Sequence, residues 1–481
     1  MLSPAVPTEN LIGGTWGPAR SGRSFPVLNP ATDEPLCEVP DAGIEDGLAA
    51  VAAAHAAGAA WAATAPRVRA EVLRKSFELM IEHREEIATL ITQEMGKALA
   101  DARAEVNYAA EFFRWFAEEA VRIGGEVRRA PAGDKWIMTN RMPVGVCYLI
   151  TPWNFPAAMA TRKIGPALAA GCTVVVKPAA ETPLTTLYVV KLMEQAGLPA
   201  GVVNVFTTHS ASVVSEAIIA DPRVAKISFT GSTFVGKKLL HQAADRVLRT
   251  SMELGGNDPF IVCADADVAA AVDGAMLAKM RNGGQACTAA NRFYVHTDIY
   301  DEFAAAMTAR MDALVVGDGL DPETQCGPVV SHKQRLEIAG LVDGALAQGA
   351  RRVAGDPDSM PSKGSFYPPT VLVDVPKDSD IAQQEIFGPV APLIRVQSDE
   401  EALDLANATE FGLIGYIYTR DLAKGLRLSA KLQAGMVGLN RGLVSDPAAP
   451  FGGVKESGVG REGGFEGIEE FLETQYVAVE W

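Results

Sequence analysis

Residues 146–178 read VCYLITPWNFPAAMATRKIGPALAAGCTVVVKP and begin an alternation of strand-like and helix-like runs that indicates the fold. Two short runs rich in β-branched residues, 146–150 and 173–177, flank a longer run, 157–170, whose length suits a helix. The alternation continues to residue 254, with strands expected at 202–206, 227–230 and 249–254 and helices at 184–196, from 210 and from 235. Strands alternating with helices in this way predict an α/β fold with a mostly parallel, Rossmann-like sheet.

Polar residues follow four of these expected strands. They are Thr151–Asn154, Lys177, Thr230–Ser232 and Glu253. In a parallel sheet the carboxyl ends of the strands share one edge, and ligands bind at that edge. We therefore expect these residues to contribute to one site.

The segment Gly231–Lys238 nearly matches the phosphate-binding loop GxxxxGK followed by Ser or Thr. It departs at Lys238, where a hydroxyl group would hold magnesium, so an ATP site is disfavoured. A strand, a glycine turn and a helix still offer free backbone amides to an anion, and a dinucleotide pyrophosphate suits this arrangement. The GxGxxG match at Gly458–Gly463 follows no expected strand and is interpreted as coincidental.

Composition restricts the class of protein. A length of 481 residues predicts two or three domains, and 48% hydrophobic with 21% charged residues is ordinary for a soluble globular protein. The formal net charge of −16 argues against nucleic acid or an anionic membrane as the main partner. The uncharged run 143–161 has the length of a membrane span, but prolines and Asn154 interrupt it.

Cysteine usage and the N-terminus suggest the compartment. The six cysteines form no CxxC pair and no cysteine–histidine cluster with zinc spacing, so no metal site is expected. A reducing, cytoplasmic compartment suits them best. Residues 1–14 show neither a secretory signal nor a transit peptide.

A candidate nucleophile lies in the sequence NGGQACTAANR, residues 282–292. A helix expected over 265–280 should end at Asn282-Gly283-Gly284, because glycine readily takes the left-handed conformation that closes a helix. With a strand expected at 293–295, Cys287 lies on a tight connection with small or polar neighbours, open to a substrate. The alternative is that Cys287 is one more small buried residue, which most cysteines are.

Glu253 and Asn154 are the candidate partners of this cysteine. A carboxylate closing an otherwise uncharged strand is either half of a structural ion pair or a general base whose pKa burial raises toward neutrality. Asn154 stands where a strand becomes a helix, so its amide is either a helix cap or a donor to an oxyanion. The residues alone leave both choices open.

Seven motifs in this chain resemble, in order and type, those of the aldehyde dehydrogenase superfamily, and they span nearly its whole length. They are TPWNFP (151–156), KPA (177–179), FTGS (229–232), ELGG (253–256), GQAC (284–287), EIFGP (385–389) and PFGG (450–453). The longer runs TPWNFPAAMATRK, FTGSTFVGK, CTAANR and GVGREGG most resemble the succinate-semialdehyde dehydrogenase group.

The resemblance implies roles for individual residues. Cys287 would attack an aldehyde, the Asn154 amide and the Cys287 backbone N–H would hold the oxyanion, and Glu253 would activate water to hydrolyse the thioester. NAD or NADP would be the cofactor, with Lys177 and Glu385 on its two riboses. The implied cofactor-binding positions are Trp153, Lys177, Ala180, Gly231, Ser232, Leu254, Glu385 and Phe387.

Substrate choice is implied by three further positions. In the succinate-semialdehyde group two arginines and a serine bind the distal carboxylate, and the matching residues are Arg162, Arg281 and Ser445. Guanidinium groups suit a carboxylate. The alternative is that both arginines make structural ion pairs at helix surfaces.

Two positions depart from the family pattern. Many relatives have a second cysteine two residues after the nucleophile and form a regulatory disulfide, but this chain has Ala289. Three residues after Lys177 the family often has glutamate, which repels a 2′-phosphate, or serine, which accommodates it. Here Ala180 does neither, so the preference between NAD and NADP stays open.

The family likeness also implies a division into domains and an assembly. We expect a dinucleotide-binding domain at 1–124 and 144–255 and a catalytic domain at 256–449. A β-hairpin oligomerisation arm and C-terminal segment are expected at 125–143 and 450–481, in a homodimer or homotetramer. The expected reaction is oxidation of succinate semialdehyde to succinate. The alternatives are glutarate semialdehyde, another aldehyde, or a non-catalytic protein that retains the fold.

Overall fold

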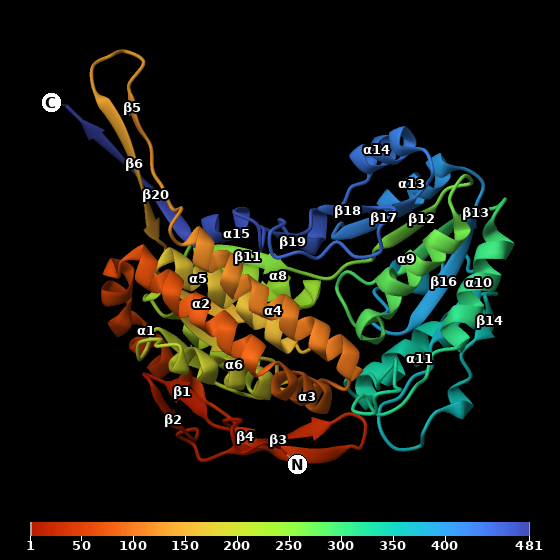
Figure 1. Ribbon diagram of the computed structural model, residues 1–481, viewed down its shortest axis with the longest axis horizontal. Helices are drawn as coiled ribbons and strands as arrows, with labels where there is room; N and C mark the ends of the chain where they lie inside the picture. The colour runs from red at the N-terminus through yellow and green to blue at the C-terminus, as the bar shows by residue number, and fades with distance from the viewer. Residues whose placement is uncertain (1, 481) are drawn as a thin grey trace.

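The structure is a computed structural model and describes residues 2–480. Within these residues the strands form two large open sheets, a projecting antiparallel sheet and a two-stranded ribbon (Figure 1). The first large sheet contains, in spatial order, β19 (Gly458–Val459), β11 (Arg249–Glu253), β10 (Val224–Thr230), β7 (Val146–Ile150), β8 (Thr173–Lys177), β9 (Val203–Val205), β1 (Asn10–Ile12) and β2 (Thr15–Gly17). The strands from β11 to β9 run parallel.

Both faces of this sheet are covered by apolar cores. Alternate residues of a strand point to opposite sides, so each strand contributes side chains to both cores. Cys147 and Leu149 enter one core, and Val146, Tyr148 and Ile150 enter the other. Helices α2 (Pro66–Glu82), α3 (Arg84–Met95), α4 (Leu99–Glu119), α5 (Pro156–Ala170) and α6 (Pro183–Gln195) contribute to the first core, and α1 (Ile44–Ala63), α7 (Ala211–Ala220) and α8 (Thr233–Ala244) to the second.

The second large sheet is built in the same way. Its strands are, in spatial order, β14 (Arg351–Ala354), β15 (Thr370–Val373), β16 (Val390–Val396), β13 (Arg292–His296), β12 (Pro259–Val262), β17 (Ile414–Tyr418) and β18 (Met436–Leu439), and β14 is joined antiparallel to β15. Helices α9 (Val268–Met280) and α10 (Tyr300–Asp312) pack on one face. The other face carries α11 (His332–Ala347), α12 (Asp380–Gln383), α13 (Asp399–Asn407) and α14 (Leu422–Lys431).

A third sheet projects from the body of the molecule together with the C-terminal end of the chain (Figure 1). It contains β5 (Val127–Arg129), β6 (Trp136–Pro143) and β20 (Leu472–Val479), all antiparallel. Strand β6 pairs with β5 on one side and with β20 on the other, and residues 144–146 do not fold back on it. Gly145, with a φ of 120°, lies between β6 and β7, and β7 enters the first large sheet.

The remaining elements are a two-stranded ribbon and a short helix near the C-terminal end. The ribbon is formed by β3 (Ser24–Asn29) and β4 (Glu34–Pro40), and the short helix α15 (Glu466–Glu469) precedes β20. The other strands and helices expected between 146 and 254 are confirmed to within a few residues. None of the described helices is by itself long and apolar enough to cross a membrane; α1 and α2 pass that test only as a pair, bent by 117°.

Candidate active site

The loop that carries Cys287 leaves α9 by a path that depends on small residues. Residues Arg281–Gly284 form a 3₁₀ turn, in which Asn282, Gly283 and Gly284 have φ values of 56°, 58° and 74°. A side chain at Gly284 would collide with the Gly388 carbonyl, so glycine is required there. The loop then reaches β13 and leaves Cys287 half-buried, which confirms the predicted helix, turn and strand.

Asn154 lies in the connection from β7 to α5 and is directed at the Cys287 loop. Its amide Nδ2 donates to the Gln285 carbonyl at 3.2 Å, two residues before Cys287. Its Oδ1 accepts from the Phe155 backbone N–H at 3.1 Å, and α5 begins without a side-chain cap. The Asn154 amide therefore links the two loops and does not cap the helix.

Glu253 ends β11 and is buried, with 3% of its surface exposed. Burial raises the pKa of its carboxyl well above the usual value, and the nearby Glu462 carboxylate raises it further, while Arg162 and Lys163 oppose the shift. Both of those cations form ion pairs with Glu462. Within residues 2–480, Glu253 Oε2 has no hydrogen-bond partner, which leaves that oxygen available to a proton or a water molecule.

Close packing restricts the surroundings of Glu253. A Cβ atom added to Gly452 would approach Glu253 Oε1 to 2.9 Å, and Gly452 has a φ of 158°. This glycine belongs to the PFGG motif (450–453). A larger residue there would press on the carboxylate, so glycine keeps room beside it.

The charges around Cys287 come from several of the predicted site residues. Burial raises the pKa of the Cys287 thiol to about 12, the Arg162 guanidinium lowers it, and the carboxylates of Glu253, Asp258 and Glu385 raise it further. The thiol is therefore protonated at neutral pH in the free protein. It needs a base to become a nucleophile.

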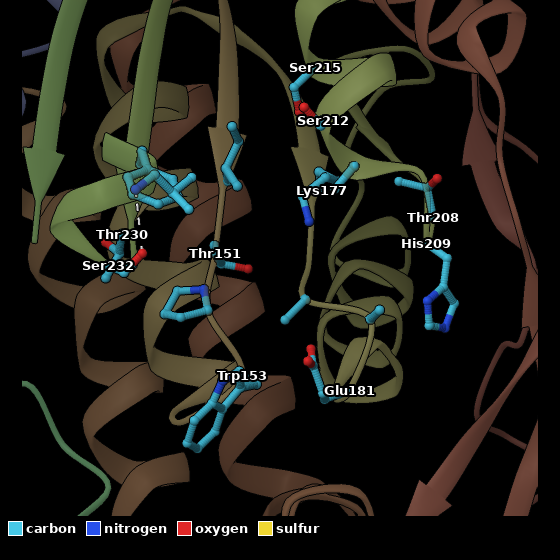
Figure 2. Close-up of a pocket in the computed structure, with 18 of the residues that line it drawn as sticks. Thr151, Trp153, Lys177, Glu181, Thr208, His209, Ser212, Ser215, Thr230 and Ser232 are labelled. Atoms are coloured by element: carbon cyan, nitrogen blue, oxygen red, sulfur yellow. Dashed lines mark hydrogen bonds between the residues drawn. The ribbon is translucent and has the colours of Figure 1, made fainter. Parts of the chain in front are cut away.

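A cavity of about 1020 Å³ lies at the carboxyl ends of the first sheet (Figure 2). Five of the predicted cofactor positions line it, namely Trp153, Lys177, Ala180, Gly231 and Ser232. Ser232 caps α8 by accepting from Val235 N at 3.4 Å, so the N-terminal end of α8 faces the cavity with its free amides. Burial lowers the pKa of Lys177 to about 8. The volume, the glycine turn and the helix end suit a dinucleotide.

The other three predicted cofactor positions lie outside the lining of this cavity. The Phe387 ring stands edge-on to the Trp153 ring, with centroids 5.3 Å apart. Leu254 packs where a side chain at Gly236 of α8 would otherwise be. Burial raises the pKa of Glu385 to about 7, against the opposing effects of the Gly256 N–H and Lys279.

Several residues that line the cavity were missed by the sequence analysis. Glu181, Thr208, His209 and Ser212 are among them, and Figure 2 shows them around the Lys177 side chain. Lys238 was noted above only because it replaces the Ser or Thr of the phosphate-binding loop pattern. Its ammonium donates to Ser212 Oγ at 3.0 Å. Glu181 follows β8, so its place after a strand was a usable signal. Ser212 and Lys238 come from separate helices and match no short motif.

The three predicted substrate-binding residues differ in their surroundings. Arg162 is buried, pairs with Glu462 and lies 4.3 Å from the Phe451 ring centre, so it is neither free nor at a helix surface. Arg281 is half-buried, with its guanidinium 5.0 Å from the Phe155 ring centre. Ser445 is half-buried in the loop after β18. Among residues 2–480, no cluster of histidine, cysteine, aspartate and glutamate has the make-up of a metal site.

Comparison with known proteins gives matches over nearly the whole chain. The aldehyde dehydrogenase family matches residues 16–477. Sequence identity is 53% to the succinate-semialdehyde dehydrogenase of Paenarthrobacter nicotinovorans, over 92% of this chain and 98% of that protein. It is 46% to the NADP(+) succinate-semialdehyde dehydrogenase of Escherichia coli K12 (98% and 97% covered) and 46% to a glutarate-semialdehyde dehydrogenase of Pseudomonas putida (97% and 97%).

Solved structures agree with the fold described above. The succinate-semialdehyde dehydrogenase of Burkholderia pseudomallei superposes with a TM-score of 0.97 at 45% identity, covering 100% of this chain and 99% of that one. The betaine aldehyde dehydrogenase of Staphylococcus aureus, solved in complex with NAD+, gives 0.95 at 35% identity, covering 98% and 94%. The predicted α/β architecture is confirmed.

Proposed function

This chain belongs to the aldehyde dehydrogenase family, and on that premise we propose that it oxidises a short carboxylated semialdehyde to the diacid, with Cys287 as nucleophile. The observation that carries the proposal is the hydrogen bond from the Asn154 amide to the Gln285 carbonyl. It brings an oxyanion donor to the loop of a thiol whose pKa responds to Glu253. The enzyme is NAD(P)-dependent; one relative is named for NADP(+), and one solved structure of a relative contains NAD+.

The first half-reaction forms a carbon–sulfur bond. Cys287 Sγ attacks the aldehyde carbon and its proton passes to Glu253, whose raised pKa suits that transfer. The carbonyl oxygen becomes an oxyanion that the Asn154 amide and the Cys287 backbone N–H stabilise by hydrogen bonds. A dinucleotide held by Trp153, Lys177 and Ser232 would supply the acceptor for the hydride, and a thioester would remain on Cys287.

The second half-reaction hydrolyses the thioester. Glu253 releases the proton it took from Cys287 to solvent and then accepts a proton from a water molecule. The resulting hydroxide attacks the acyl carbon, and the carbon–sulfur bond breaks. The oxyanion donors act again on the tetrahedral intermediate. Cys287 regains its proton and the carboxylic acid leaves. A neutral free thiol and a buried base are the starting condition that this cycle needs.

We favour succinate semialdehyde as substrate over glutarate semialdehyde. A relative at 53% identity and one at 46% are named for the first, and relatives at 46% and 45% for the second. One methylene changes affinity by only about 1–3 kcal/mol, so the preference is expected to be graded. Absorbance of the reduced nicotinamide, followed with both semialdehydes and with NAD+ and NADP+, tests the proposal. Turnover of neither semialdehyde would favour a binding protein that retains the fold.

Arg281→Ala should raise KM for succinate semialdehyde by about 10- to 100-fold, the value of hydrogen bonds to a charged group. The half-buried guanidinium is able to pair with the distal carboxylate. KM for an uncharged aldehyde of similar length should change little. Arg310→Ala is the control, because Arg310 of α10 forms an ion pair with Asp273 of α9. Equal changes in KM for both aldehydes would contradict an anion anchor at Arg281.

Glu181→Gln should shift the cofactor preference about tenfold toward NADP+, measured as the ratio of kcat/KM values. Glu181 lines the cavity beside Lys177 and acts electrostatically on it, so its carboxylate opposes an added phosphate. Glu216→Gln is the control, because it removes the same charge from the exposed side of α7. An unchanged ratio would place the 2′-hydroxyl of the cofactor away from Glu181.

We also propose a cytoplasmic homodimer or homotetramer. The free thiols of the six cysteines support a reducing compartment. The projecting sheet of β5, β6 and β20 exposes Val127, Met142 and Tyr476, which supports a partner subunit because uncovered strand edges with apolar side chains promote association. Light scattering of the intact protein and of a Tyr476→Asp variant tests the assembly, which should weaken in the variant.

A further inference from the structure

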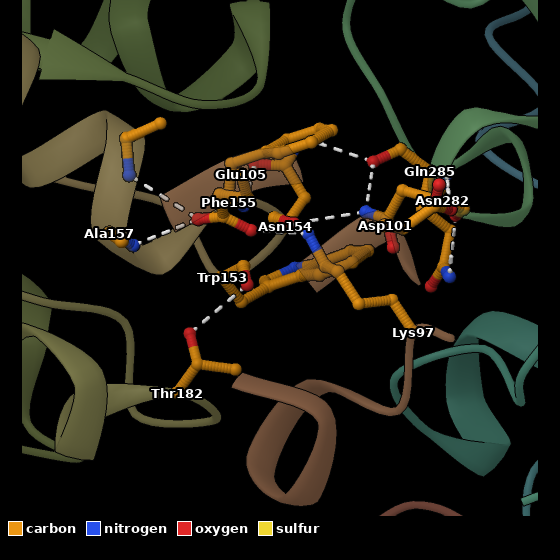
Figure 3. A network of polar contacts seen from close by, with 11 residues as sticks. Lys97, Asp101, Glu105, Trp153, Asn154, Phe155, Ala157, Thr182, Asn282 and Gln285 are labelled. Carbon is orange, nitrogen blue, oxygen red and sulfur yellow. Dashed lines mark hydrogen bonds and ion pairs between the residues drawn. The ribbon is translucent and has the colours of Figure 1, made fainter. Parts of the chain in front are cut away.

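One face at the start of α4 joins the two loops that carry Asn154 and Cys287. Lys97, Asp101 and Glu105 are spaced four residues apart, which places them on one side of the helix and of the turn before it. The side chains of Lys97 and Glu105 are completely buried, and Asp101 is half-buried. Figure 3 shows their polar groups beside the Asn154 and Asn282 segments.

Lys97 and Glu105 bind the backbone of Asn154 and of the first turn of the helix that follows it. The Lys97 ammonium donates to the Asn154 carbonyl at 2.7 Å and to the Glu105 carboxylate at 2.6 Å. The other Glu105 oxygen accepts from the backbone N–H groups of Ala157 and Ala158, at 2.9 and 3.3 Å. These two amides belong to the first turn of α5. The pair therefore fixes the Asn154 backbone and the helix that follows it.

Asp101 holds the other loop. Its carboxylate accepts from the Asn282 backbone N–H at 2.8 Å. The Asn282 amide then donates to the Asn154 carbonyl at 2.9 Å and to the Gln285 carbonyl at 3.0 Å. Asn282 is a non-glycine residue with a φ of 56°, a conformation that needs such support. The same helix face thus fixes the turn that leads to Cys287.

This arrangement contributes little to the stability of the fold, but it can fix the position of the catalytic loops relative to each other. Taking the charges of Lys97 and Glu105 out of water carries a large desolvation cost, and apolar residues of similar size often serve a fold as well. Apart from the bond between them, their hydrogen bonds go to backbone atoms of Asn154 and of the α5 turn that follows it. A donor misplaced by about 1 Å can lower a rate about 100-fold, so alignment of these loops has a measurable value.

We propose that Lys97, Asp101 and Glu105 are positioning residues that hold the Asn154 amide in register with the Cys287 sulfur. The inference rests on the proposed function, in which that amide stabilises the oxyanion. The Asn154 Nδ2 atom carries two hydrogens. One is directed at the Gln285 carbonyl, and the other reaches the substrate oxygen only while the two loops keep this orientation.

A double-mutant cycle tests the proposal. The pair Lys97→Met and Glu105→Gln removes both buried charges together, and it is introduced into the wild-type protein and into Asn154→Ala. Asn154→Ala alone should lower kcat about 10²- to 10³-fold. The pair should lower kcat about 10- to 100-fold in the wild type and less than about threefold in Asn154→Ala, because the amide it positions is gone. The dissociation constant of the reduced cofactor, measured by fluorescence, should not change.

The outcomes separate the inference from the proposed function. No oxidation of any semialdehyde by the wild type would overturn the proposed function. A wild type that is active, with an equal loss from the pair in both backgrounds, would overturn the positioning role alone. An active Asn154→Ala variant with unchanged kcat would also overturn it. If the double variant fails to fold, Glu105→Gln alone preserves shape and undergoes the same cycle, with a smaller loss expected to vanish in Asn154→Ala.

A matched control comes from another buried lysine. Lys226 is buried, pairs with Glu470 and lies on β10 against the C-terminal segment. Lys226→Met removes a comparable buried charge away from the catalytic loops. It should lower the thermal midpoint while kcat stays within about twofold. A loss of kcat in Lys226→Met as large as that in the Lys97 and Glu105 pair would show that any buried lysine has this effect and would overturn the inference.

Discussion

Cys287→Ala will lose at least about 10⁴-fold in kcat for semialdehyde oxidation, because the reaction has no second nucleophile to form the thioester. The loss should fall on kcat and leave cofactor binding intact, since the Cys287 loop does not line the dinucleotide cavity. Steady-state absorbance at saturating substrate gives kcat, and fluorescence titration with reduced cofactor gives the dissociation constant.

A second cysteine variant controls for the loss of a thiol as such. Cys37 lies on β4 and is half-buried like Cys287. Cys37→Ala should keep kcat within about twofold, as is usual for a change away from the site. Covalent labelling adds a direct test, because acylated protein detected by mass spectrometry should disappear in Cys287→Ala. Turnover that survives in Cys287→Ala would exclude Cys287 as the nucleophile.

Glu253→Gln will lower kcat by about 10²- to 10⁴-fold, the range for loss of a general base. The amide matches the carboxylate in shape but cannot accept a proton. Acyl-enzyme should accumulate in the variant when hydrolysis is the step that suffers most, and mass spectrometry will show one acyl group on Cys287. Glu119→Gln is the control, because it removes another buried carboxylate, one that pairs with Arg122 at the end of α4.

The same variant should change the dependence of rate on pH. A base works only when deprotonated, so the rate must fall as the pH is lowered through the pKa of Glu253. Burial and the Glu462 carboxylate raise that pKa well above 4.5, so the fall begins at a higher pH than for an ordinary glutamate. The acid limb should be lost in Glu253→Gln. A wild-type rate that stays flat down to pH 4.5 would contradict the proposed environment of Glu253.

The local elements of this protein could be predicted from sequence because their patterns are short in range. The runs at 146–150 and 173–177 are mostly apolar, and the structure buries every residue of both. The partner of β6 was not predictable in this way, because β20 lies more than 300 residues further along the chain. A two-residue period identifies a strand and carries no information about which distant strand it joins.

The candidate site shows the same division. Cys287, Glu253 and Asn154 lie in motifs and follow predictable elements, so sequence could single them out. The proposed positioning residues Lys97, Asp101 and Glu105 could not be found from sequence, because they look like ordinary charged residues of a helix. Only the fold reveals that their partners are backbone atoms of residues far along the chain. Burial, which sets their role, is a property of the assembled structure.

The protonated state of the Cys287 thiol has a consequence for the resting protein. Peroxide reacts with thiolates far faster than with thiols, and sulfinic and sulfonic acids once formed are not readily reversed. A thiol whose pKa burial raises to about 12 presents very little thiolate at neutral pH. We therefore expect the sulfur of the resting protein to react slowly with oxidants.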